Sequence, residues 1–229
     1  MAARRQPNPH SESVDDYLKA ILALEGPGER AMSTALADRL GVAPASVTNM
    51  LQKLAVLPTP LVEYERHHGV RLSEAGKRRA LEVLRHHRLI ETFLYEVLDY
   101  PLEEVHEEAE RLEHFISERF EERIAAKLGN PTIDPHGHSI PAMDGKMAEK
   151  NSVPLTQVIG EGPFEVDNIS DRDAATVKLL STSGIAHGIQ LRLREPREKD
   201  VYSVSVGGSA QVLHLSREAA DTIRVHPSH

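Results

Sequence analysis

The stretch S-T-A-L-A-D-R-L-G-V-A-P-A-S-V-T-N-M-L-Q-K-L, residues 33–54, decides the fold at the start of this chain. Its first eight residues carry apolar side chains at helical spacing, Gly41 provides a tight turn, and Pro44 begins a second helix. The apolar stripe of this second helix consists of Val47, Met50, Leu51 and Leu54. The spacing predicts a helix-turn-helix.

Elements on either side extend this motif. Apolar residues recur with a 3,4 spacing over 13–24, which predicts a helix with Ser13 as its N-cap. Residues 62–66 and 70–72 are typical of two strands joined by a short Gly-containing turn, a wing. Residues 1–73 are therefore predicted to form a winged helix-turn-helix DNA-binding domain.

The rest of the chain divides into a helical part and a strand-rich part, so the fold class is mainly α with small β. Long helices are predicted over about 73–97 and about 102–128, separated by a proline break. After them the chain is mostly irregular, and short strands then alternate with turns around one helix near 173–181. The predicted domains after the first are helical over 74–141, a linker over 142–152, and a small β-barrel over 153–229.

The composition narrows the possible chemistry. Cysteine is absent, which leaves carboxylate and imidazole as the strong metal ligands, and there are 13 histidines. No stretch approaches the ~18 consecutive apolar residues that a membrane span needs. Residues 1–13 contain two arginines but no apolar run behind them, so they are predicted to be a disordered arm and not a signal peptide. We expect a cytoplasmic protein with no membrane partner.

The net charge of -8 is unevenly distributed. Residues 1–80 carry 11 Lys and Arg against 9 Asp and Glu, residues 81–130 carry 6 against 13, and residues 131–229 carry 10 against 13. A mildly basic first segment suits contact with phosphate, and an acidic centre suits the binding of cations.

Potential metal ligands cluster in this acidic centre. His106, Glu110, Glu113 and His114 lie at i, i+4, i+7 and i+8, which places all four on one face of a single helix. His87 and Glu91 form a second pair at i and i+4 on the preceding helix. Spacing alone leaves two interpretations open, because a solvated acidic face with incidental histidines has the same pattern.

Several motifs resemble the diphtheria-toxin-repressor family of metal-dependent transcriptional regulators, and especially its manganese-transport-regulator branch. V-A-P-A-S-V-T-N-M-L-Q-K-L (42–54) resembles the recognition helix, and L-S-E-A-G (72–76) the start of the helix after the wing. H-R-L-I-E (87–91) and V-H-E-E-A-E-R-L-E-H (105–114) resemble the two ligand segments. The tail is similar to the SH3-like domain of longer members, with L-L-S-T-S-G-I-A-H-G at 179–188 and a second match over 204–225.

The resemblance implies two metal sites. The primary regulatory site falls on Asp16, Glu110, Glu113 and His114. The ancillary site falls on His87, Glu91 and His106, with Asp171 and Asp173 as candidates for a ligand from the C-terminal domain. Arg88 matches a position that helps to hold an anion beside the ancillary metal.

The identity of the metal is inferred from two departures from iron-type members. Asp16 and Glu110 stand where those members have Met and Cys, and hard carboxylate in place of soft sulfur favours Mn(II), with Fe(II) as the next choice. Zn(II), Co(II) or Cd(II) can substitute in vitro, since affinity rises along the Irving-Williams series. Lys19 stands where two-metal manganese regulators have a carboxylate, which argues against a closely spaced metal pair.

The same resemblance implies a homodimer that binds palindromic double-stranded operator DNA, since helix-turn-helix readers generally work as dimers on half-sites about one turn apart. Base-reading and phosphate-contacting candidates lie on the recognition helix and on the wing. They are Pro44, Ala45, Ser46, Thr48, Asn49, Arg66, His67, His68 and Arg71.

The predicted function is a manganese(II)- or iron(II)-dependent repressor of metal-uptake genes, with no enzymatic activity and no small-molecule substrate. One alternative is a metal-dependent hydrolase that uses the carboxylate and histidine cluster, although no phosphate loop, nucleophile elbow or H-E-x-x-H accompanies it. The other is a DNA-binding regulator whose effector is an organic ligand of the C-terminal domain.

Overall fold

The computed structural model describes residues 11–26, 28–148, 150–194 and 200–228. Most of the arm predicted over 1–13 therefore lies outside the described residues. The chain forms two compact units, Met1–His86 with Met143–Gly145 and His87–Ala142 with Lys146–His229. No helix in the described parts of the chain is both long and apolar enough to cross a bilayer.

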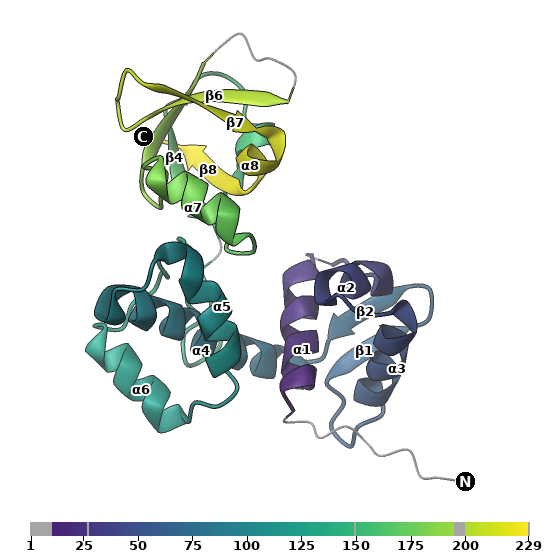
Figure 1. Ribbon diagram of the computed structural model, residues 1–229. Coiled ribbons are helices and arrows are strands. Elements are labelled where there is room, and N and C mark those ends of the chain that lie inside the picture. Colours follow the sequence, from purple (N-terminus) through teal and green to yellow (C-terminus); the bar gives the residue numbers. More distant parts are fainter. Residues whose placement is uncertain (1–10, 27, 149, 195–199, 229) are drawn as a thin grey trace. The chain divides into compact units, whose positions relative to one another are not determined.

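The first unit is a winged helix-turn-helix (Figure 1). Its elements are α1 (Glu12–Leu24), α2 (Ser33–Leu40), α3 (Pro44–Ala55), β1 (Val62–Glu65) and β2 (Gly69–Leu72). The core joins α1 to both helices of the motif and to the wing, with Leu18, Leu36 and Leu51 fully buried. Gly41, with φ at 63°, ends α2 in the left-handed conformation that glycine adopts without strain. The helix-turn-helix is thus formed as the spacing predicted.

The wing has a third, short pairing that the sequence pattern did not predict. Ala31, between α1 and α2, forms an antiparallel bridge with Val70. A Cβ at neighbouring Gly69 would lie 2.6 Å from the carbonyl oxygen of Ala31, so only glycine permits this close approach. The root of the wing is therefore fixed to the body of the unit.

The start of α1 differs from the prediction. The N-cap is Ser11 and not Ser13, and the helix begins at Glu12. The backbone carbonyl of Ser11 accepts hydrogen bonds from Val14 N at 2.8 Å and Asp15 N at 3.2 Å. Three polar residues in succession suit an N-terminus equally well, so composition alone did not fix the residue.

The helical part of the second unit also differs from the prediction. The helix α4 (Glu74–Leu98) contributes residues to both units, and α5 (Leu102–Leu112) and α6 (Glu118–Lys127) follow. The single helix predicted over 102–128 is wrong, because a turn separates α5 from α6. Ser117 caps α6 by accepting the N–H of Phe120 at 3.3 Å. Glu113 and His114 therefore lie in the turn after α5 and not along one helical face.

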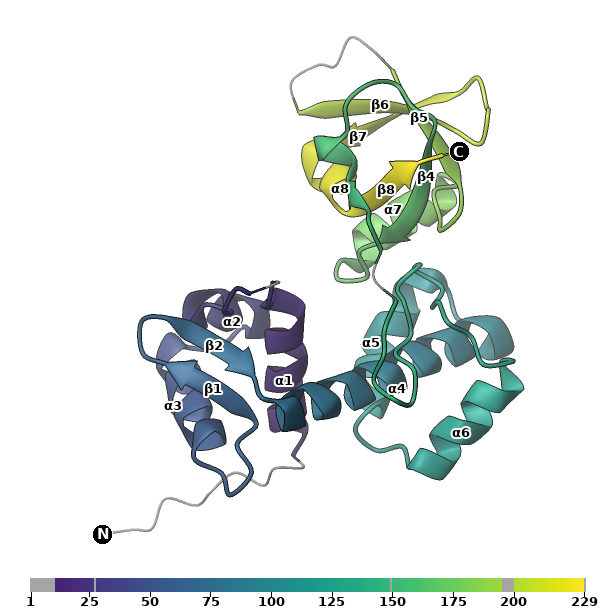
Figure 2. The same ribbon diagram turned by 180° about the vertical axis from the view of Figure 1, so that it is seen from behind.

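The C-terminal part of the second unit is a barrel-like sheet (Figure 2). Six strands lie in the order β3-β8-β4-β5-β6-β7, and each pair described is antiparallel. They are β3 (Val153–Pro154), β4 (Phe164–Ile169), β5 (Gln190–Leu193), β6 (Val201–Val206), β7 (Val212–Ser216) and β8 (Ile223–Pro227). The helix predicted near 173–181 is α7 (Ala174–Thr182), and α8 (Arg217–Asp221) and a 3-10 turn (Leu155–Gln157) were not predicted. The mainly α fold class with a small SH3-like barrel is confirmed.

The helices and the barrel of the second unit share one hydrophobic core. Helix α7 packs against α5, and a single cluster of buried residues runs from α4 and α5 into the sheet. Ile90 and Val105 represent the helices in it, and Val166 and Leu180 the barrel. Side chains from both parts can therefore contribute to one site.

Candidate functional site

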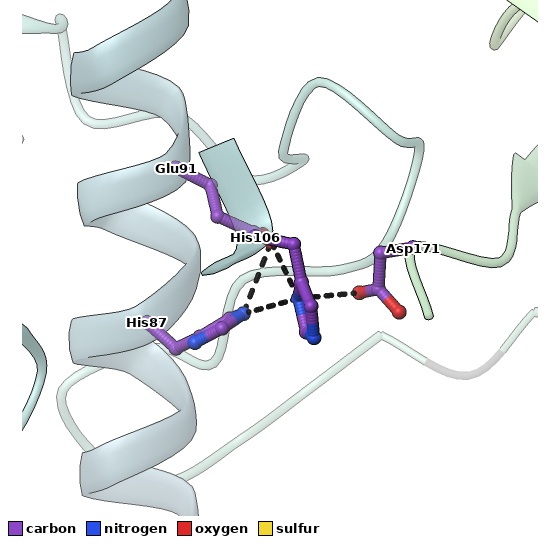
Figure 3. Close-up of side chains that lie close together, drawn as sticks. All are labelled: His87, Glu91, His106 and Asp171. Carbon is purple, nitrogen blue, oxygen red and sulfur yellow. Dashed lines mark hydrogen bonds and ion pairs between the residues drawn. The ribbon is translucent and has the colours of Figure 1, made fainter. Parts of the chain in front are cut away.

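Two histidines and a glutamate converge at the centre of the second unit (Figure 3). His87 and Glu91 lie one turn apart on α4, and His106 faces them from α5. His87 Nε2 is 3.0 Å from Glu91 Oε1 and 3.1 Å from His106 Nδ1. His106 Nδ1 is also 3.1 Å from Glu91 Oε1. Three potential ligand atoms thus form a nearly equilateral triangle.

The size of this triangle matches the coordination shell of a divalent ion. Bonds of about 2.1 Å place neighbouring ligand atoms roughly 3.0 to 3.4 Å apart in octahedral or tetrahedral geometry. A hydrogen-bonded network explains the triangle less well, since two imidazole N–H groups that both donate to Glu91 Oε1 leave the 3.1 Å edge between the two nitrogens without a bridging proton. The donor set of imidazole nitrogen and carboxylate oxygen fits Mn(II), Fe(II) and Zn(II).

Burial and charge at the triangle also favour a cation. His87 is 3% exposed and Glu91 is fully buried. Burial alone would raise the pKa of Glu91, but the charge of His87 and hydrogen bonds from His106 and His87 hold it well below its usual range. Burial likewise opposes charge on His106, but the hydrogen bond to Glu91 and the charge of Asp171 raise its pKa. An ionised carboxylate in this interior needs a positive counter-charge.

Glu113 orients His87. Its Oε2 lies 2.6 Å from His87 Nδ1, which fixes the ring so that Nε2 points into the triangle. A carboxylate behind a histidine is the usual support of a metal-ligating imidazole. The other oxygen of Glu113 lies 3.3 Å from His114 Nε2, and Glu110 Oε1 lies 3.7 Å from His87 Nδ1. Both glutamates assigned to the primary site are therefore close to a histidine assigned to the ancillary site.

The irregular segment after α6 brings further donors that the sequence analysis had missed. His136 is fully buried, its Nδ1 lies 3.8 Å from Glu91 Oε1, and neither ring nitrogen has a hydrogen-bond partner among the described residues. Glu91 Oε2 also lacks one within the same set. Asp134 and His138 lie beside His136, with Asp134 Oδ2 and His138 Nδ1 3.4 Å apart. The signal in the sequence was D-P-H-G-H, which places an acid and two imidazoles in one Pro- and Gly-containing turn.

The loop owes its shape to Asp134. One oxygen of its buried carboxylate accepts the backbone N–H groups of both His136 and His138 at 2.9 Å. Burial alone would lower the pKa of His138, but the hydrogen bond to Asp134 and the charges of Asp134 and Asp171 raise it. Acidic groups therefore surround the imidazoles on the loop side as well.

Of the two candidate ligands from the C-terminal domain, only Asp171 lies close to the histidines of this cluster. Its Oδ2 lies 3.7 Å from His106 Nδ1 (Figure 3). The same oxygen lies 3.8 Å from His138 Nδ1. Asp173 instead caps α7 by accepting from Thr176 N at 3.2 Å. Arg88, considered for an anion, donates to Ser139 O and lies 3.5 Å from Asp134 Oδ2, so it holds the loop.

The remaining predicted metal ligand, Asp16, lies half-buried on α1 of the first unit. Its neighbour Asp15 is buried and receives two hydrogen bonds from Arg79 of α4, both at 2.9 Å. This bidentate pair fixes the rotation of α1 about its axis within the unit. Lys19, one turn after Asp16, is also half-buried.

The predicted DNA-reading residues lie on the exposed face of α3. Val47, Leu51 and Leu54 point inward and are fully buried, as expected, whereas Met50 of the predicted stripe is half-buried. The outward residues are Pro44, Ala45, Ser46 and Asn49, all exposed, and the half-buried Thr48. Thr48 Oγ1 donates to Pro44 O at 3.2 Å, which leaves its methyl group and its lone pairs for contact with DNA.

The wing residues are exposed but not all are equivalent. Arg66, His67 and His68 lie at the turn, where His67 has a φ of 67°. Arg71 is on β2, and its Nε donates to Glu63 Oε2 at 2.7 Å. A phosphate contact by Arg71 would compete with this ion pair. Arg66, His67 and His68 lie instead in the turn at the end of the hairpin.

Comparison with known proteins places these features in a family. Residues 10–70 match the model described as "Iron dependent repressor, N-terminal DNA binding domain", and residues 73–142 match "Iron dependent repressor, metal binding and dimerisation domain". The chain is 33% identical over 227 residues to the iron-dependent repressor IdeR of Mycobacterium leprae, covering 93% of this chain and 96% of that protein. It is 36% identical over 162 residues to IdeR of Mycobacterium tuberculosis, covering 68% and 70%.

Solved structures agree with the sequence relatives. A manganese-dependent transcriptional repressor in complex with manganese is 36% identical, with a TM-score of 0.85 over 93% of this chain and 99% of that one. The manganese regulator SloR is 30% identical, with a TM-score of 0.75 over 93% and 98%.

A winged helix-turn-helix followed by a helical unit with a buried imidazole and carboxylate cluster defines a metal-responsive DNA-binding regulator. The chain belongs to the iron-dependent repressor family, which includes the diphtheria toxin repressor, and within it to the manganese-regulator branch. It is a transcriptional repressor that depends on a divalent metal ion.

Proposed function

We propose that the protein represses metal-uptake genes by binding palindromic operator DNA as a homodimer when Mn(II), or else Fe(II), occupies its regulatory site. The dependence on a divalent ion is supported by the triangle of His87 Nε2, His106 Nδ1 and Glu91 Oε1, because its edges of 3.0 to 3.1 Å match the spacing of ligands around one ion. The functional division follows the predicted domains, with 1–73 binding DNA, 74–141 binding metal and dimerising, 142–152 as linker and 153–229 as SH3-like domain.

We assign the first ion to His87, Glu91 and His106. Asp171 and His136 complete its shell, since both lie within 4 Å of a member of the triangle. With the charges of Glu91 and Asp171 the shell is neutral around a divalent ion. Hard oxygen ligands and the absence of sulfur favour Mn(II), and Zn(II), Co(II) and Cd(II) act as substitutes in vitro.

We assign a second, regulatory ion to Asp16, Glu110, Glu113 and His114. The support is the resemblance of residues 105–114 to the family's ligand helix and the hard chemistry of the four side chains. Because Asp16 belongs to the first unit and the other three to the second, the ion would set the angle between the two units. Through linkage, metal and operator would then strengthen each other's binding by about 1 to 3 kcal/mol.

A homodimer is supported by apolar side chains that α5, α6 and the turn between them leave in solvent. Phe115 is 71% exposed, Phe120 50% and Leu112 38%. Exposed aromatic side chains in such a group are typical of an interface. A symmetric dimer would present two copies of α3 to successive turns of the major groove.

On operator DNA, Asn49 would read adenine through its amide, and Pro44 and Ala45 would contact thymine methyl groups. Ser46 and Thr48 offer hydroxyl groups to either base edges or phosphate. Arg66, His67, His68 and Arg71 would contact phosphates.

A titration of metal-free protein tests the proposal directly. Fluorescence anisotropy of an operator fragment is followed as Mn(II), Fe(II) or Zn(II) is added, with a chelator as the reversal control. Binding that appears only with metal supports a metal-dependent repressor. Operator binding that ignores the chelator would favour an organic effector, and hydrolysis of phosphate esters with Mn(II) would favour the metallohydrolase.

A further inference from the structure

The loop that carries His136 is pressed against strand β4 of the barrel. Ile169 N donates to His136 O at 3.0 Å, and a Cβ at Gly137 would lie 2.3 Å from Asp167 O. Gly137 has a φ of 97°, so both its conformation and the contact require glycine. The barrel backbone therefore helps to hold this loop in place.

Lys150 also joins the loop to the barrel. Its Nζ donates to Gly137 O at 2.7 Å and lies 2.7 Å from Asp167 Oδ1. Asp167 is 5% exposed and accepts two more hydrogen bonds, from Ser152 Oγ at 2.7 Å and Asn168 Nδ2 at 2.9 Å. Lys150 thus has one ammonium group shared between the loop backbone and a buried carboxylate.

Further hydrogen bonds hold Ser152, and through it Asp167, in place on the barrel. Arg224 of β8 donates to both the hydroxyl and the carbonyl oxygen of Ser152. Burial alone would raise the pKa of Asp167, but hydrogen bonds from Lys150 and Ser152 and the Lys150 charge hold it below its usual range. The carboxylate therefore stays ionised at neutral pH and retains the ammonium group.

The position of this loop matters because the loop carries His136. His136 is one residue from the Gly137 carbonyl that Lys150 holds, and its ring is fully buried 3.8 Å from Glu91. A shift of the loop by about 1 Å would move this ring out of reach of an ion held by the triangle, and supporting contacts of this kind usually change metal affinity 10- to 100-fold.

We propose that Lys150 is a positioning residue for the metal centre: it holds the segment 134–138 on the barrel so that His136 faces Glu91 and the ion. This inference rests on the proposed metal site of the second unit. Through its ion pair with Lys150 of the linker, Asp167 gives the SH3-like domain a second contribution to that site besides Asp171, although neither Lys150 nor Asp167 touches the metal.

The test compares Lys150→Met, Lys150→Arg and the control Lys127→Met in the full-length protein. Lys127 is an exposed lysine in the last turn of α6. Hydrogen exchange of the Ile169 N–H is measured in metal-free protein, since this amide reports the seating of the loop without any ion. Co(II) affinity is then measured by titration, together with the melting temperature.

Lys150→Met is expected to speed Ile169 exchange about tenfold and to weaken Co(II) binding about tenfold, with the melting temperature within a few degrees of wild type. Lys150→Arg, which can still donate to both oxygens, should recover most of both losses, and Lys127→Met should show neither. If Lys150→Met fails to fold, Asp167→Asn removes the same ion pair and replaces it in the test.

Unchanged Ile169 exchange or unchanged Co(II) affinity in a folded Lys150→Met protein would overturn the inference and leave the proposed metal site intact. Failure of wild-type protein to bind Co(II) or Mn(II) would instead remove the proposed site and this inference with it. The two failures are distinct because they appear in different proteins.

Discussion

The winged helix-turn-helix and the proposed metal centre place their polar groups in opposite environments. In the first unit the residues assigned to DNA lie on the surface of α3 and the wing, outside a core of Leu18, Leu36 and Leu51. In the second unit the assigned ligands Glu91 and His136 are fully buried. Exposed polar groups leave the stability of a fold nearly unchanged, whereas buried charges destabilise it unless a counter-charge is supplied. Folding of the first unit should therefore be independent of metal, and the second unit should depend on it.

The most disruptive change should confirm that the first unit has its own apolar core. Leu51→Ala removes a fully buried side chain from α3, and we expect the unit to lose about 3 kcal/mol of unfolding free energy. The measurement is chemical denaturation followed by circular dichroism. The control Val56→Ala, at a position 73% exposed, should change stability by less than about 0.5 kcal/mol. Loss of Co(II) binding by folded Leu51→Ala would show that the two units are not independent.

The second change targets the buried centre. His106→Ala removes one corner of the triangle, and we expect Mn(II) or Co(II) affinity to fall about 100-fold. Mutation of residues that only support a metal ligand already lowers metal affinity 10- to 100-fold. Isothermal titration of metal-free protein measures the affinity. His214→Ala, which removes an imidazole bonded to Ser203 on the barrel surface, should bind metal as wild type does. Equal affinity in His106→Ala would contradict the triangle as a metal site.

The sequence predicted the two regions to different extents for a physical reason. The helix-turn-helix is a local pattern, so the spacing of Val47, Leu51 and Leu54 identified both α3 and its buried face. His87, Glu91 and His106 were also found from helical spacing together with the resemblance. His136 was missed because it lies in an irregular loop held by long-range contacts, which leave no periodicity in the sequence.

The break between α5 and α6 shows the opposite error, in which a periodic pattern predicted regular structure where the chain turns. Acidic and apolar residues continue at helical spacing through Glu113 and beyond, which predicted one helix. Ser117 offered a competing local signal, a cap followed by an acidic first turn, and this signal corresponds to the observed start of α6. The turn that results places Glu113 against His87.

The third change tests whether the two units communicate. Asp16→Ala should leave a folded dimer whose internal centre still binds Co(II), but metal should no longer strengthen operator binding, a loss of about 5- to 150-fold. Operator anisotropy with and without Mn(II) is the measurement. Glu12→Ala, an exposed acid on the same helix, is the matched control. A full metal response in Asp16→Ala would remove the proposed link between the units.

The fourth change separates two roles within the exposed surface. Asn49→Ala should weaken operator binding by about 1 to 3 kcal/mol and relax the preference at one base pair. Arg66→Ala should instead weaken binding equally for all sequences and lower the slope of log affinity against log salt by about 1. Binding to operators altered at single positions, measured at several salt concentrations, distinguishes them. A uniform loss in Asn49→Ala would mean that Asn49 contacts only the DNA backbone.

The smallest expected effect concerns the Asp167–Lys150 ion pair that holds the His136 loop on the barrel. Its contribution to stability should depend on pH. Hydrogen bonds and the charge of Lys150 hold the pKa of Asp167 below its usual value of about 3.9, against the effect of burial. A carboxyl group whose pKa falls on folding stabilises the protein fully above its unfolded pKa and loses that contribution as pH falls through the folded value. Asp167→Asn should therefore cost about 1 to 2 kcal/mol between pH 5 and pH 8, and the difference from wild type should shrink below about pH 4. Denaturation at a series of pH values measures this, with Asp200→Asn, at the more exposed pair with Arg217, as the control. A difference that persists unchanged to pH 2 would mean that Asp167 stabilises the loop through its shape and not through its charge.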